Sequence, residues 1–102
     1  MSLRELLTEE QRLAVLATLG EAERYRLNER VLKSALSSQA LVVGRDDIRA
    51  HLEWLARQGL VTVLKLDTTT PDGALWIATL TEAGDDVRRG RSFPGIKRPE
   101  PG

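Results

Sequence analysis

The sequence predicts an α+β fold, and three features in the second half of the chain carry that prediction. In residues 45–58 the apolar positions 48, 52, 55 and 56 recur with the spacing of one helix face. Gly59 follows where a left-handed residue ends a helix. An alternating strand then reaches Leu66, and a turn-rich loop over 67–73 leads to a second strand over 74–81. This order is the second half of a winged helix-turn-helix, with a three-helix core, a two-stranded β wing and a short C-terminal helix.

Thr8 predicts the start of the first helix, because its hydroxyl can accept a backbone hydrogen bond and Gln11 stands at the capping-box position. Apolar residues then recur along one face, and Gly20 predicts the end of the helix. That face is formed by Leu13, Leu16, Ala17 and Leu19. An apolar patch at residues 3–7 is expected to lead into this helix.

Asn28 is a good N-cap and predicts the start of a second helix that runs to about Ser38. The face expected to be buried holds Val31, Leu32, Ala35 and Leu36. Residues 25–27 are expected to form a short extended segment before it. The connection over 39–44 is rich in apolar residues, so we expect it to pack under the helices. Residues 82–89 are predicted to form the short C-terminal helix.

Composition limits the class of protein. The chain has 102 residues, the size of one domain, and 41% of them are hydrophobic. It has no cysteine, which excludes disulfides, thiolate metal sites and a cysteine nucleophile. Its apolar runs are too short for a membrane helix, and its N-terminus lacks the apolar core of a signal peptide. We therefore expect a cytoplasmic protein that binds no membrane, metal or cofactor.

The charge is balanced overall but uneven along the chain. Fifteen basic and fifteen acidic residues sum to zero, whereas nucleic-acid-binding domains usually carry a basic excess. The basic residues of positions 88–98 have no acidic residue among them: Arg88, Arg89, Arg91, Lys97 and Arg98. We divide the chain into a winged-helix domain at residues 1–90 and a basic Pro- and Gly-containing tail at 91–102. The tail is expected to be extended or mobile.

Two motifs resemble those of known regulators. His51-Leu52-x-x-Leu55-x-x-x-Gly59-Leu60-Val61 resembles the end of the recognition helix and the start of the wing in ArsR-type and MarR-type proteins. Leu80-Thr81-Glu82-Ala83-Gly84 is similar to the segment that leaves the wing in MarR-like and PadR-like domains. The whole chain, including Pro-Gly-Ile-Lys-Arg-Pro at 94–99, resembles a small family of Mu-like prophage proteins. The resemblance implies a homodimeric DNA-binding regulator that pairs through its terminal helices.

The candidate recognition helix is residues 45–58. If Ile48, Leu52 and Leu55 face the core, Ala50 and Arg57 point directly away from it, flanked by Asp46, Glu53 and Trp54. The candidate DNA contacts on this helix are Arg45, Arg49, Glu53 and Arg57. Arg45 and Arg49 are the best placed, because the N-terminal end of a recognition helix reaches base edges. The helix is neutral, so a solvated or protein-binding face is the alternative.

Other candidate features are weaker. The wing tip at 67–73 has two acidic residues and no basic one, which leaves Lys65 as the one candidate DNA contact of the wing. Trp54 is expected to pack against the wing or, alternatively, to anchor a dimer partner. His51 is the single histidine and is expected to have a structural role, without a metal. The chain has no phosphate loop or nucleophile motif, so enzyme activity is not expected.

The basic tail has three possible roles. Its arginines can complement the negative end of the last helix, and the tail can neutralise DNA phosphates or dock in an acidic groove of a partner. A solvated tail without any of these roles is the alternative. The function expected is a small, prophage-encoded DNA-binding protein of transcription-regulator type. The alternative is a winged-helix protein–protein interaction module for phage development or assembly, without sequence-specific DNA binding.

Overall fold

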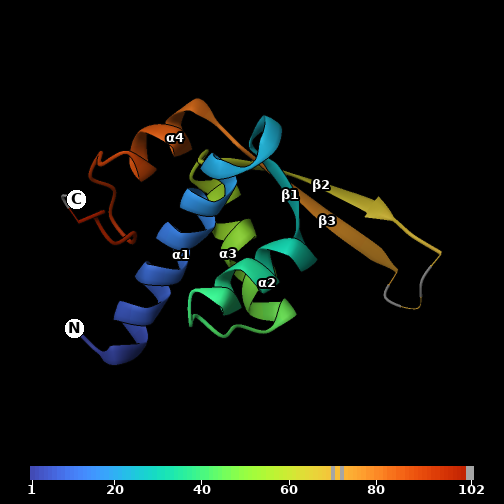
Figure 1. The fold of residues 1–102 in the computed structure, drawn as a ribbon, viewed down its shortest axis with the longest axis horizontal. Helices are drawn as coiled ribbons and strands as arrows, with labels where there is room; N and C mark the ends of the chain where they lie inside the picture. The colour runs from blue at the N-terminus through green and yellow to red at the C-terminus, as the bar shows by residue number, and fades with distance from the viewer. Residues whose placement is uncertain (70, 72, 101–102) are drawn as a thin grey trace.

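The computed structural model describes residues 1–69, 71 and 73–100. Its elements, in chain order, are α1 (Leu3–Glu21), a 3-10 turn at Glu23–Tyr25, β1 (Arg26–Asn28), α2 (Glu29–Ser38), α3 (Arg45–Arg57), β2 (Val61–Asp67), β3 (Ala74–Leu80) and α4 (Glu82–Arg88). The sheet is antiparallel with the order β1-β3-β2. The helices lie together, and β2 and β3 extend away from them as a long hairpin (Figure 1). The predicted α+β class is confirmed, and α3, the two wing strands and α4 lie within one residue of their predicted bounds.

The first helix begins earlier than the sequence prediction. Ser2 is its N-cap, and the Glu5 N–H donates to Ser2 Oγ at 3.1 Å. A hydroxyl residue followed three residues later by Glu or Gln is the capping-box pattern, and both Ser2 with Glu5 and Thr8 with Gln11 fit it. The helix begins at the first of the two. The prediction of a start at Thr8 is therefore wrong, and residues 3–7 form the first turns of α1. Gly20 lies inside α1 and does not end it.

The sheet has three strands where a two-stranded wing was predicted. The extended segment expected at 25–27 becomes β1, which pairs with β3 from Arg26 opposite Thr79 to Asn28 opposite Ile77. In the wing, β2 pairs with β3 from Val61 opposite Leu80 to Asp67 opposite Ala74. Two residues of the predicted wing tip, at positions 70 and 72, lie outside the described residues.

The second helix begins as predicted and buries the predicted face except at Val31. Asn28 Oδ1 accepts hydrogen bonds from the N–H groups of Arg30 and Val31. Val31 was predicted to be buried and is exposed, because Glu29, Leu32 and Leu36 form the inward stripe in its place. The apolar connection behaves partly as expected: Val43 is buried, whereas Val42 is 83% exposed.

One core joins the helices to the base of the sheet. The best-buried side chains are Val15, Leu16, Leu19, Leu32, Leu36, Ile48, Leu52, Leu55 and Leu60. Leu52 is fully buried, which confirms the predicted inward face of α3. No described helix is long and apolar enough to span a bilayer.

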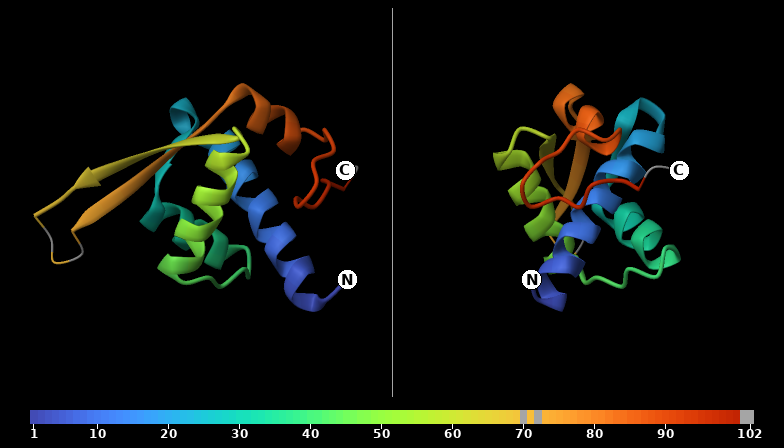
Figure 2. Two further views of the ribbon diagram at one scale, coloured as in Figure 1. Left: turned by 180° about the vertical axis from the view of Figure 1, so that it is seen from behind. Right: turned by 90° about the vertical axis from the view of Figure 1, so that its left-hand side faces the viewer.

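The C-terminal segment folds back onto α1, and the prediction of an extended or mobile tail is wrong for residues 91–100 (Figure 2). Ile96 is 6% exposed and joins the core. The Lys97 N–H donates to the carbonyl of Glu9 at 3.2 Å, and Arg12 Nη1 donates to the carbonyl of Gly95 at 3.0 Å. The apolar side chains in the segment supply the driving force, because folding back removes them from water. The division of the chain at residue 90 stays a prediction.

Candidate nucleic-acid interface

The outward side of α3 lies between the wing and α1 (Figure 2, left). Ile48, Leu52 and Leu55 point inward, and Asp46, Ala50, Glu53 and Arg57 are exposed on the opposite side. Among the described residues, no hydrogen bond or ion pair engages Arg57. Arg57, the last residue of α3, is therefore a long cationic side chain on the helix face that a winged helix presents to DNA.

A groove separates α3 from the wing. Its lining residues enclose about 390 Å³ and are Glu53, Ala56, Arg57, Val63, Lys65 and Trp76. Lys65 Nζ lies 4.2 Å from the centroid of the Trp76 ring, which holds the ammonium group by a cation–π contact. The structure thus brings together the predicted candidates Glu53, Arg57 and Lys65 in one groove.

Arg49 points inward, to a buried carboxylate. Its Nε and Nη2 donate to the two oxygens of Glu29 at 2.7 and 2.9 Å, and Nη2 also donates to the Ala74 carbonyl at 3.2 Å. The Trp76 N–H donates to Glu29 Oε2 at 2.7 Å. The backbone pairing of β1 with β3 stops at Asn28. Beyond that point, the side chains of this ion pair hydrogen bond to the backbone of β3 where a strand would otherwise do so. The geometry gives Arg49 a positioning role between α3 and the wing.

The electrostatics of Glu29 agree with this role. Burial acts to raise the pKa of Glu29, but the hydrogen bonds from Arg49 and Trp76 and the charges of Arg49 and Arg45 outweigh it and lower the pKa. Glu29 is therefore a stable carboxylate despite being 3% exposed. Arg45 is exposed at the start of α3, and its positive charge also contributes to the lowered pKa of Glu29.

The basic run at 88–98 is largely neutralised by acidic residues, most of them close to it in sequence and one, Glu10, from α1. Arg88 and Arg89 pair with Asp85 at 2.6 and 3.0 Å, and Arg91 lies 3.9 Å from Asp86. Lys97 pairs with Glu10 at 3.4 Å and Glu100 at 3.8 Å. Arg98 is exposed. These five candidates lie away from the wing, at the other end of the molecule (Figure 1).

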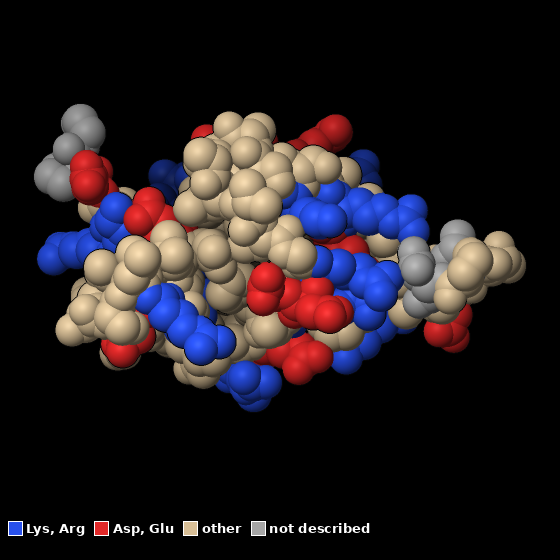
Figure 3. Space-filling view, turned by 90° about the horizontal axis from the view of Figure 1, so that it is seen from below, with Lys and Arg blue, Asp and Glu red and all other residues tan. Residues whose placement is uncertain are grey.

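The face of the molecule seen from below is mixed in charge (Figure 3). On the face seen in Figure 3, basic side chains lie beside the wing tip and acidic side chains lie among them. A continuous positive stripe from α3 to the C-terminal segment is absent from this face, as far as the described residues go. On this face, a duplex would therefore meet separate basic side chains and not a continuous basic surface.

Trp54 packs on the side of α3 away from the wing, so the prediction that it leans on the wing is wrong. The guanidinium carbon of Arg12 lies 3.8 Å from its ring centroid, and Phe93 meets it edge-on at 6.2 Å. The sequence offers no signal for this choice, because Arg12 and Phe93 come from opposite ends of the chain. Arg12 is also a functional candidate that the sequence analysis missed.

His51 has the structural role expected of it. Its Nε2 lies 2.7 Å from Gln11 Oε1, and the side chain is buried. Burial and the charge of Arg12 lower the pKa of His51, while Asp47 acts in the opposite direction. Across the described part of the chain, no three His, Asp or Glu side chains gather as metal ligands.

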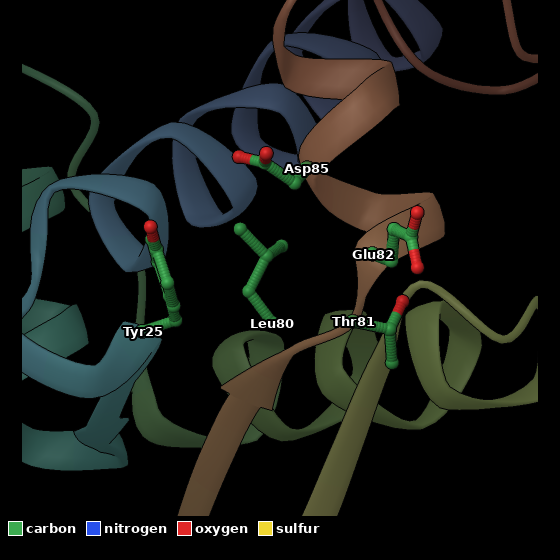
Figure 4. Close-up of a pocket in the computed structure, with 5 residues that line it drawn as sticks. All are labelled: Tyr25, Leu80, Thr81, Glu82 and Asp85. Carbon is green, nitrogen blue, oxygen red and sulfur yellow. The ribbon is translucent and has the colours of Figure 1, made fainter.

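A hollow of about 250 Å³ lies beside α4 and is lined by Tyr25, Leu80, Thr81, Glu82 and Asp85 (Figure 4). Asp85 and Tyr25 stand on either side of Leu80, and Glu82 points away from them. Thr81 Oγ1 is used to cap α4. The carboxylates make this hollow unsuitable for DNA phosphates, and its residues show no nucleophile paired with a base.

Two sequences are similar to this chain over most of its length. The uncharacterized protein gp26 of Escherichia phage Mu is 38% identical over 98 residues, which are 95% of each chain. An uncharacterized protein of Haemophilus influenzae is 40% identical over 82 residues, which are 80% of this chain and 74% of that protein. The chain matches no known family model.

The fold is similar to that of PadR from Bacillus subtilis in complex with operator DNA, with a TM-score of 0.62 and 18% identity. The match covers 87% of this chain and 52% of the PadR chain, so this chain spans about half the length of that protein. The likeness confirms the winged-helix fold. The assignment to an ArsR or MarR type stays a prediction.

Proposed function

This chain belongs to the protein family that includes gp26 of Escherichia phage Mu, and we propose that it is a prophage-encoded regulator that binds double-stranded DNA through α3 and the wing. One observation carries the proposal. Arg57 stands unpaired among the described residues on the outward face of α3, beside a groove that also holds Lys65. The likeness to a PadR structure that contains operator DNA supports this use of the fold.

Each candidate residue of α3 and the wing has a role that follows from its chemistry. Arg57 can donate two hydrogen bonds to guanine in the major groove, and Glu53 can accept one from the amino group of cytosine. Lys65 and Arg45 are suited to phosphates, which fix the position of the duplex without reading sequence. Arg49 acts indirectly, because its ion pair with Glu29 holds the wing against α3.

The alternative is a protein-binding winged helix, and one feature of the wing favours it. Leu64 and Leu66 of β2 are 52% and 42% exposed. They alternate along the strand with Val63 and Lys65, so they lie on the sheet face opposite the groove. Exposed aliphatic side chains of this kind are typical of protein interaction surfaces. A protein that failed to bind DNA would be assigned to this class.

Fluorescence anisotropy with a labelled duplex at several salt concentrations tests the proposal. We expect micromolar affinity for random duplex at physiological salt. The double variant Arg57→Ala/Lys65→Ala should lower the slope of log affinity against log salt by about 0.9 for the phosphate contact of Lys65, and by about 1.8 if Arg57 also contacts a phosphate. If Arg57 instead reads a base, its share of the loss will appear as reduced discrimination between sequences.

The matched control is Arg91→Ala/Arg98→Ala, which removes the same charge at the other end of the molecule. Its slope should equal that of the wild type. A lower slope seen only with this control variant would place the DNA interface on the C-terminal segment. No binding of any duplex at low salt would overturn the proposal in favour of the protein-interaction function.

A further inference from the structure

A second concave site lies on the α1 side of α3. It encloses about 350 Å³ and brings together Arg4, Thr8 and Arg12 of α1 with Asp47, His51 and Arg57 of α3. Arg57 is far in sequence from Arg4 and Arg12, and it meets them because α1 runs alongside α3. Neither Arg4 nor Arg57 has a hydrogen bond or ion pair in the part of the chain that the structure describes.

Arg12 carries an unsatisfied donor at this site. Its Nη1 is used by the Gly95 carbonyl at 3.0 Å, and its guanidinium group stacks on Trp54. Its Nε, however, is buried and has no hydrogen-bond partner among the described residues. Because Nε is enclosed by protein atoms, a ligand in this site would reach Arg12 through its terminal guanidinium nitrogens and not through Nε.

The charge balance of the site favours an anion. The three guanidinium groups face one carboxylate, that of Asp47, which also accepts the Gly44 N–H at 3.2 Å as a helix cap. His51 adds no charge near neutral pH, because its pKa is lowered. An adjoining hollow shares Arg4 and Arg12 but is also lined by Glu5 and Glu9, so an anion is disfavoured there.

We propose that Arg4, Arg12 and Arg57 form a phosphate-binding site on the α1 side of α3. Guanidinium groups match phosphate oxygens in geometry and charge, and the three of them outnumber the single carboxylate of the site. The phosphate can come from a duplex backbone, which would then be held on both sides of α3, or from a free phosphate ion. The first source rests on the proposed DNA binding, and the second does not.

Nuclear magnetic resonance of the ¹⁵N-labelled full chain tests the site directly, with the Arg12 Nε–H signal as the reporter. Inorganic phosphate should shift this signal saturably at millimolar concentration, and chloride at equal ionic strength should not. Arg4→Gln should weaken phosphate binding several-fold with an unchanged melting temperature, since Arg4 is exposed. Arg24→Gln, which removes an exposed arginine outside this site, is the matched control.

The two sources are separated by repeating the titration with a duplex. If the backbone fills the site, the duplex will shift the same signal and Arg4→Gln will lower the salt slope by about 0.9. If only inorganic phosphate shifts it, the site stands as one for a free anion, whether or not the protein binds DNA. An absent or unsaturable shift, or an equal response to chloride, would overturn the site itself, even if the groove variants confirm DNA binding.

Discussion

The ion pair between Glu29 and Arg49 connects three segments through two side chains. Glu29 opens α2, Arg49 lies on α3, and both hydrogen bond to the backbone of β3. The Trp76 ring adds a cation–π contact at 4.7 Å to the Arg49 guanidinium carbon. The carboxylate oxygens of Glu29 accept hydrogen bonds from the Arg49 guanidinium group and from a backbone N–H. These bonds offset the free-energy cost of burying the charge of Glu29.

Arg49→Ala should destabilise the protein by about 3–5 kcal/mol, because it leaves a buried carboxylate without its partner. Adding Glu29→Gln should recover part of that loss, since the amide oxygen can still accept the Trp76 N–H without carrying a charge. Urea unfolding of the wild type, both single variants and the double variant measures this coupling. Additive effects of the two changes would contradict it.

The same pair makes stability depend on pH. Since the pKa of Glu29 is lowered in the folded state, its contribution is fully present above the unfolded pKa of about 4.3 and disappears as the pH falls through the folded value. The cost of Arg49→Ala should therefore shrink on acidification. An equal cost at neutral and acidic pH would show that Arg49 stabilises the fold by packing alone.

The segment that leaves the wing holds α4 against the turn between α3 and β2. Thr81 Oγ1 donates to the Gly59 carbonyl at 2.7 Å and accepts the Gly84 N–H at 3.1 Å. The Thr81 N–H donates to the Leu60 carbonyl at 3.1 Å. Gly84 is buried against that carbonyl, where a Cβ atom would overlap with the backbone. A glycine is therefore required by close approach of two backbones.

Gly84→Ala should cost about 1–3 kcal/mol, because the added methyl group forces α4 away from the Leu60 carbonyl. Gly20→Ala is the matched control. Its Cβ would meet the end of the flexible Arg88 side chain, and alanine gains about 1 kcal/mol of helix propensity over glycine inside α1. Thermal or urea unfolding should show a loss for the first variant and little change for the second. Equal losses would mean that backbone contact at Gly84 is not the cause.

At the scale of the whole molecule, the uncovered side chains at the N-terminus are the most exposed apolar feature of α1. Leu3, Leu6 and Leu7 are 71%, 50% and 43% exposed. Together with Ile96 they line a hollow of about 490 Å³ whose rim carries both acidic and basic residues. In a dimer with a two-fold axis the same surface meets itself, so acidic residues of one copy can lie against basic residues of the other. A rim of mixed charge therefore suits pairing with a second copy.

We expect a dimer through α1 at micromolar concentration, as the resemblance of the sequence to ArsR-like and MarR-like proteins implies. Sedimentation should give twice the chain mass of 11.3 kDa for the wild type and the chain mass for Leu6→Glu. Leu64→Glu introduces the same charge at a comparably exposed leucine of the wing and should leave the dimer intact. A monomeric wild type would contradict the dimer and weaken the operator-binding function with it.

Local patterns determined most of the elements. The spacing of Ile48, Leu52 and Leu55 defined both the extent of α3 and its buried side, since a helix repeats its faces every 3.6 residues. Gly59 adopts the left-handed backbone that ends the helix segment, with φ at 76°. Asn28 caps α2 as expected. The candidate DNA contacts Arg57 and Lys65 also followed from periodicity, which places them on the side away from the core or on the wing.

Only the tertiary structure decided what each exposed or polar side chain meets. Arg49 finds Glu29 twenty residues earlier, and Lys97 finds Glu10 from the other end of the chain. The pattern of a helix shows which face is apolar but not which element covers it, so Trp54 could be assigned to the wrong neighbour. The same holds for the phosphate site, because its arginines belong to two helices whose contact depends on the packing of the whole core. Ion pairs and stacking depend on distances in space, and these are set by the fold and not by neighbours in sequence.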